Sequence, residues 1–191
     1  MRSIRSVVLG AALMASVGAA PAVAQSGAQF SLGGGLTLPL GDFGDAAGTG
    51  FHGLAAVAFA PANFPVGFQI DGMFHRLGID DDPIGGDVDA NFQIIQGTAN
   101  AVYRFVTAED TKVRPYLIGG VGLYNSKLTG DDVPAGLDSE TDFGINAGAG
   151  FDFVAGAVGL FVEGRFHNIF TEDESTNFIP ITVGVRLGGG S

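Results

Sequence analysis

The sequence predicts an all-β fold, an eight-stranded antiparallel up-and-down β-barrel that crosses a membrane. Three observations lead to this prediction: a strict alternation of apolar and polar residues in 142–153, its recurrence in eight segments, and connections that alternate between short and long. In 142–153 one parity is always Phe, Ile or Ala, and the other is Asp, Asn or Gly. Successive side chains of a strand point to opposite faces. The segment therefore has one apolar face and one small polar face, as expected for lipid outside a narrow polar lumen.

The composition agrees with a single β domain. The chain has 191 residues with 32 Gly, 16 Phe, no Cys and no Trp. This glycine content is far above the usual ~7 % and suits strands that pack closely and curve, whereas each Gly inside a helix costs about 1 kcal/mol. The lack of Cys excludes a disulfide scaffold, thiol catalysis and thiolate metal sites.

Residues 1–24 are predicted to be a cleaved signal peptide. Arg2 and Arg5 precede an apolar run over 7–20, and Ala22-Val23-Ala24 forms a small-residue cleavage site before Gln25. The run is too short to cross a bilayer comfortably as a helix. Removal of the two arginines leaves seven basic against 20 acidic residues, a net charge of −13, which argues against a nucleic-acid partner.

The barrel domain is predicted over 25–187, with eight strands in chain order. They are expected at 29–38, 50–60, 66–77, 91–105, 114–127, 142–153, 158–170 and 178–187. In six of them the alternation assigns an outward and an inward parity, and for the strand over 114–127 no facing is assigned. The strand over 50–60 is apolar on both parities, so its facing stays open.

The connections support an outer-membrane arrangement. Those expected after the second, fourth and sixth strands are short, whereas those after the first, third, fifth and seventh are mostly longer and acidic, which is typical of such barrels. A soluble barrel such as a lipocalin is the alternative, with apolar residues inside. It would bury several charged residues in a dry core at high cost. They are Asp71, Asp152, Glu163, Arg165 and Arg186.

The mature region resembles small outer-membrane β-barrels of the OmpA/OmpX/OmpW-like superfamily. Three segments carry the resemblance: 35–43 (GLTLPLGDF), 114–124 (RPYLIGGVGLY) and the last strand, 179–187. The resemblance implies a Gram-negative-type outer membrane as the location. It also implies contact with lipid and lipopolysaccharide, insertion by the barrel assembly machinery, and a monomer.

The last strand departs from the family pattern. Family members commonly end on an aromatic residue that helps the assembly machinery, whereas this strand ends on Leu187 and continues into 188–191, read GGGS. Such a glycine-rich segment predicts a flexible tail.

A charge network is predicted to fill the lumen, since the interior of an eight-stranded barrel is occupied by side chains. Opposite charges on the inward parity are expected to pair at short range, and we interpret them as a structural plug. A gated path for ions or protons through the same residues is the alternative. The network comprises Asp71, Arg104, Asp152, Glu163, Arg165 and Arg186, joined by His75 and His167.

No metal site or cofactor is predicted. The three histidines have no metal-ligand spacing on one element. The acidic loops are expected to be solvated, although clustered carboxylates also suit Ca²⁺ or Mg²⁺, which would bridge them to lipopolysaccharide or another partner. These loop residues include Asp80, Asp81, Asp82, Asp131, Asp132, Glu172, Asp173 and Glu174.

The sequence predicts no enzyme. No serine lies in a His-x-Ser pattern or in the G-x-S-x-G elbow of a serine hydrolase. The predicted function is a structural or surface-interaction role in the outer membrane, and a narrow channel for ions or small solutes is the alternative. The pattern does not identify a ligand, because fold alone does not specify function.

Overall fold

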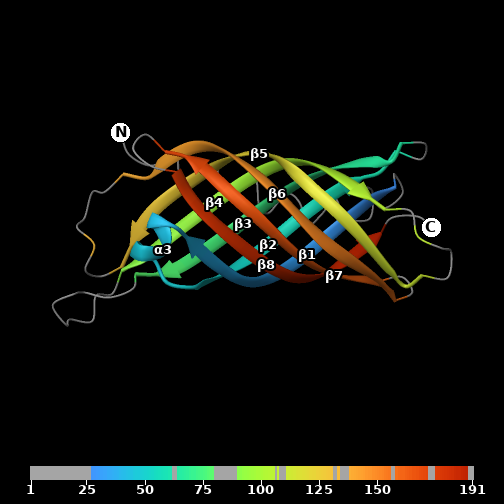
Figure 1. Ribbon diagram of the computed structural model, residues 1–191, viewed down its shortest axis with the longest axis horizontal. Coiled ribbons are helices and arrows are strands. Elements are labelled where there is room, and N and C mark those ends of the chain that lie inside the picture. Colours follow the sequence, from blue (N-terminus) through green and yellow to red (C-terminus); the bar gives the residue numbers. More distant parts are fainter. Residues whose placement is uncertain are drawn as a thin grey trace, which may run out of the picture.

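The eight strands of the protein are antiparallel and close into one barrel (Figure 1). The computed structural model describes residues 27–61, 64–79, 90–105, 107, 111–130, 133, 138–155, 158–171 and 175–188. Each strand pairs with its neighbours in sequence, and β1 pairs with β8 to close the sheet. The elements are β1 (Ala28–Leu40), α3 (Asp42–Ala46), β2 (Gly50–Phe59), β3 (Val66–Gly78), β4 (Asn91–Arg104), β5 (Val113–Thr129), β6 (Glu140–Ala155), β7 (Val158–Phe170) and β8 (Ser175–Gly188).

The two ends of the barrel differ. The connections after β1, β3, β5 and β7 lie at one end, which we call the loop end, and those after β2, β4 and β6 lie at the other, the turn end. Figure 1 shows the strands running obliquely to the long axis, with α3 at the loop end. Because the number of strands is even, β1 begins and β8 ends at the turn end.

All eight predicted strands are present in the predicted order, and five of them, β1, β3, β5, β6 and β8, are longer than expected. Ladder pairing extends β5 and β6 at the loop end, where Ser126 opposes Glu140. It also starts β8 at Ser175, opposite Phe170, and continues it to Gly188. Strand propensity depends on the neighbouring strand more than on the residue itself, so polar residues outside the apolar band still pair.

The first connection contains a short helix that the sequence did not predict. Gly41 has a positive φ (60°), which glycine adopts readily, and α3 follows directly. Within the described residues, no helix is long and apolar enough to cross a membrane.

The inward and outward faces agree with the predicted parities, and the structure assigns β2. His52, Leu54 and Ala56 face the lumen, while Phe51 and Phe59 are exposed on the outer wall. Pairing of β2 with both β1 and β3 sets its facing, which its own sequence left open.

Inward glycines make room for large side chains in the lumen. A Cβ added at Gly184 would lie 2.5 Å from the ring of Phe161, and one added at Gly150 would overlap the ring of Tyr116. The rings of Phe161 and Tyr116 thus occupy space that side chains at these positions of the neighbouring strands would otherwise fill.

Gly184→Ala is therefore expected to lower the free energy of unfolding by about 1–3 kcal/mol, the usual cost of overpacking. Urea unfolding of the barrel from lipid vesicles, followed by circular dichroism, measures this difference. Gly164→Ala is the matched control, since a Cβ there has no neighbour within 4 Å. Equal losses in the two variants would contradict the packing explanation.

Candidate functional site in the lumen

Arg165 joins two carboxylates across the middle of the lumen. Its Nη1 lies 2.8 Å from Oδ2 of Asp71, and its Nε lies 2.5 Å from Oε1 of Glu163. Glu163 and Arg165 share the inward face of β7, and β3, which carries Asp71, is the opposite strand of the ring. All three residues are at most 3 % exposed. The predicted pairing of these three residues is present.

Neutral donors surround the Asp71 carboxylate. The Thr98 hydroxyl donates to Oδ1 (2.6 Å), and the side-chain amides of Asn100 and Gln69 donate to Oδ2 (3.0 and 2.9 Å). Asn146 from β6 donates in turn to Asn100 (2.9 Å). These bonds satisfy both oxygens of the Asp71 carboxylate and hold the neighbouring side chains in place, whereas Nη2 of Arg165 and Oδ1 of Asn146 have no hydrogen-bond partner among the described residues.

A second group of charges lies nearer the turn end. Arg186 Nη1 is 2.9 Å from Oδ1 of Asp152, and Arg104 Nε is 3.4 Å from Oδ2 of the same carboxylate. The Arg186 guanidinium also lies over the rings of Tyr116 and Phe161, at 4.8 and 4.7 Å from their centroids, a cation–π arrangement that adds to its stabilisation.

Tyr116 connects the two groups into one line of hydrogen bonds. Its hydroxyl donates to Oε2 of Glu163 (2.8 Å) and accepts from Nη2 of Arg186 (2.9 Å). Arg104 extends the line to Gln29 at the start of β1 (3.2 Å). The line carries equal numbers of opposite charges, which lets every charge be compensated inside the barrel. The cations are Arg104, Arg165 and Arg186, and the anions are Asp71, Asp152 and Glu163.

The histidines form a separate layer, which differs from the expectation for His75 and His167. Both face the lumen and are fully buried, but among the described residues neither pairs with a carboxylate. The Thr37 hydroxyl lies 2.8 Å from Nδ1 of His75, and the Tyr124 hydroxyl lies 2.9 Å from Nδ1 of His167. The histidines lie too far along the barrel from the carboxylates to pair with them. His75, for example, is four residues beyond Asp71 on β3, about 13 Å along the strand.

His52 belongs to the same layer. Its Nδ1 lies 3.1 Å from the Thr37 hydroxyl, and its Nε2 lies 2.8 Å from the Thr182 hydroxyl. Within the described residues, no group of three or more His, Asp or Glu is placed to hold a metal.

An apolar cluster closes the lumen at the loop end, beyond the histidines. Phe178 lies between two imidazoles, with its ring centroid 5.1 Å from that of His75 and 5.0 Å from that of His167. Phe43 of α3 and Phe92 pack against the cluster and meet edge to face at 5.4 Å. We call this cluster the apolar cap. It consists of Ala47, Leu77, Ile94, Tyr124, Ile169 and Phe178.

Sequence reasoning missed the cap and the neutral partners. The signal was present, because Leu77, Ile94, Ile169 and Phe178 are large apolar residues on the inward parity, each near the loop end of its strand. Parity likewise placed Thr37, Asn100 and Thr182 on the polar face of their strands, whereas the sequence left open the facing of His52, Tyr116 and Tyr124, which also link the layers.

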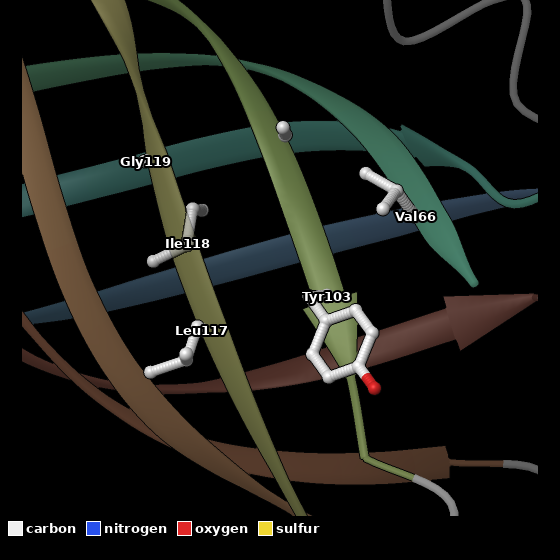
Figure 2. A pocket seen from close by; sticks show the side chains of 6 residues that line it. Val66, Tyr103, Leu117, Ile118 and Gly119 are labelled. Carbon is white, nitrogen blue, oxygen red and sulfur yellow. The ribbon is translucent and has the colours of Figure 1, made fainter.

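Two shallow apolar hollows lie on the outer wall. One, of about 310 Å³, is near the turn end, where Val66, Tyr103 and Leu117 surround small residues of β4 and β5 (Figure 2). The other, of about 370 Å³, lies farther along β4, over Gly97 and Ala99. Both are lined mainly by outward residues, and Thr98 and Gly122 of the inward parity also line the second.

The predicted loop sites fall outside the described residues, as does the predicted signal peptide over 1–24. They are Asp80, Asp81, Asp82, Asp131, Asp132, Glu172, Asp173 and Glu174.

Comparison with known proteins gives a family and a fold. The family model of the outer membrane protein beta-barrel domain matches residues 9–187. The search against curated proteins gives no match. The structure of Neisserial surface protein A is similar with a TM-score of 0.64 at 19% identity, covering 84% of this chain and 96% of that chain.

Two further structures are similar over the same extent. A major outer membrane protein from Thermus thermophilus has a TM-score of 0.52 at 13% identity, covering 84% of this chain and 98% of that chain. The outer membrane enzyme PagL has a TM-score of 0.50 at 16% identity, covering 84% and 99%. At such identities the likeness shows the fold alone.

Proposed function

Because the chain belongs to the outer membrane protein beta-barrel domain family, we propose that it is a closed outer-membrane barrel with a structural or surface-interaction role. In this role the predicted signal peptide directs export, and the barrel assembly machinery inserts the chain as a monomer. The apolar wall contacts outer-membrane lipid, and the loop end faces outward, as is usual for the longer connections of such barrels. The acidic loops then meet partners outside the cell.

Closure of the lumen is the observation that carries this proposal. Arg165 spans the interior between Asp71 and Glu163, and Phe178 is fully buried in the apolar cap. A path for hydrated ions would have to displace a compensated ion group and an apolar layer. The side chains instead stabilise a rigid barrel that presents its loops.

We also propose that the protein is not an enzyme. The histidine rings bond to hydroxyls of Thr37, Thr182 and Tyr124, and in the described residues no serine hydroxyl is hydrogen-bonded to a histidine. The likeness to PagL extends to the fold at 16% identity and does not carry that protein's activity to this chain.

A narrow channel is the second candidate, and one observation favours it. The hydrogen-bonded line from Gln29 through Tyr116 to Asp71 is continuous, and at its turn end the Arg104 and Asp152 side chains are 26% and 14% exposed. Water therefore reaches the hydrogen-bonded line at its turn end. Conduction would require both Arg165 and the apolar cap to move.

Planar-bilayer recording separates the two candidates. The folded barrel is expected to give no single-channel steps at either polarity, with insertion verified by the heat-modifiable shift of the folded form in gels and detection verified with a large porin. Steps that disappear in Glu163→Gln would instead support the channel and contradict the closed barrel.

A further inference from the structure

Three arginines and one carboxylate lie on the inward parity at the turn end. Arg104 and Arg186 both contact Asp152, and Arg114 lies directly opposite Asp152 in the ladder between β5 and β6. Arg114 is exposed and shares the inward parity of Tyr116. We call Arg104, Arg114, Asp152 and Arg186 the basic mouth, because its positive charges outnumber its negative charge.

Arg114 gives the lumen an excess of positive charge. The hydrogen-bonded line of three cations and three anions is balanced without it. Arg114 adds a fourth cation, and among the described residues it forms no ion pair. An anion bound in the basic mouth would compensate this charge.

Two buried polar atoms at the basic mouth have no hydrogen-bond partner in the described part of the chain. They are Nε of Arg186 and the hydroxyl oxygen of Ser31, and both residues are 4% exposed. Their side chains are neighbours on the inward face, because Ser31 of β1 opposes Arg186 of β8 in the ladder. Buried polar atoms of native proteins are nearly always hydrogen-bonded, so this pair indicates a bound group.

Space for a small ligand lies beside the Arg186 side chain. Gly159 is the ladder neighbour of Arg186 on β7 and places no side chain in the lumen. A Cβ built at Gly159 would have no atom nearer than 3.6 Å. Since the Arg104 and Asp152 side chains are partly exposed, a ligand can reach this space from the turn end.

We propose that the basic mouth binds a small oxyanion, a carboxylate or a phosphate, that enters from the turn end. Its oxygens accept hydrogen bonds from Nε of Arg186 and from the Ser31 hydroxyl. Arg104 and Arg114 at the entrance add positive charge, and guanidinium groups suit carboxylate and phosphate geometry. The inference goes beyond the proposed function and holds on whichever side of the membrane the turn end lies.

Asp152 competes with this ligand for the same arginines. Its Oδ1 lies 2.9 Å from Nη1 of Arg186, and its Oδ2 lies 3.4 Å from Nε of Arg104. Asp152→Asn removes the competing charge and is therefore expected to tighten oxyanion binding by about tenfold. A purely structural Asp152 would give a loss of stability and no gain in binding.

The test is isothermal titration calorimetry of the folded protein in a non-ionic detergent, with inorganic phosphate and with acetate at constant ionic strength. Arg104→Gln is expected to bind about tenfold more weakly, as for one lost charge-assisted hydrogen bond, and Ser31→Ala about fivefold more weakly. The matched control is Arg76→Gln, which removes an exposed arginine of the outer wall at the loop end and is expected to leave binding unchanged.

Binding of phosphate alone would assign phosphorylated ligands, and binding of acetate as well would add carboxylates. Four results would overturn the inference: no heat with either anion at millimolar concentration, equal heat with chloride, unchanged binding by Arg104→Gln and Ser31→Ala, or an equal loss in Arg76→Gln. Unchanged or weaker binding by Asp152→Asn would also overturn it, since the arginines would then serve Asp152 alone. The heat-modifiable gel shift verifies that each variant is folded.

Discussion

Arg165→Met is expected to lower the free energy of unfolding of the barrel by about 3–5 kcal/mol, the cost of breaking a buried ion pair from one side. The substitution keeps much of the side-chain volume but leaves Asp71 and Glu163 without their shared cation. Both carboxylates are buried in a narrow lumen, where an uncompensated charge is poorly solvated. The excess anion would also disturb Tyr116, whose hydroxyl donates to Glu163.

The midpoint of unfolding in urea, read from the heat-modifiable gel shift of vesicle-bound protein, measures the Arg165 effect. Arg114→Met removes an exposed arginine at the turn end and is expected to change stability by less than about 0.5 kcal/mol. Adding Glu163→Gln to Arg165→Met restores the balance of charges and should recover part of the loss, because the two sites are coupled. No recovery would mean that Arg165 acts through packing and not through charge.

Phe178→Ala is expected to cost about 3–5 kcal/mol, the range for removing a buried aromatic side chain. The ring is fully buried, stacks on His167 and meets His75 edge to face. Its removal leaves a cavity in the apolar cap, directly above the polar layer. The variant should therefore also admit water at the loop end, and intermittent conductance steps are expected once Arg165→Met is added, because the cap and Arg165 both block the lumen.

Phe166→Ala is the matched control for the cap. This residue lies on the lipid face of β7 and is 43% exposed, so lipid fills the space that the ring leaves. A much smaller loss of stability is expected, and no conductance is expected even when Arg165→Met is added. If both variants behaved alike in the urea and bilayer measurements, Phe178 would not close the lumen.

The sequence by itself determined the architecture of this protein. Alternation with a period of two and alternating connection lengths specified eight strands and their order, and in six of the strands also which residues face lipid. This information is local, because the face of a side chain follows from its place in its own strand. It also placed Asp71, Glu163 and Arg165 on one wet face.

Only the tertiary structure decided which inward residues meet. Arg165 reaches Asp71 because closure of the barrel sets β3 opposite β7, and strand register decides the axial level of each side chain. The same levels separate His75 and His167 from the carboxylates and gather Phe178 with residues of distant strands in the apolar cap. Pairing with neighbouring strands also decided which face of β2 points inward, and it extended β6 beyond its predicted bounds. Contacts across a lumen depend on closure and register, which no single segment encodes.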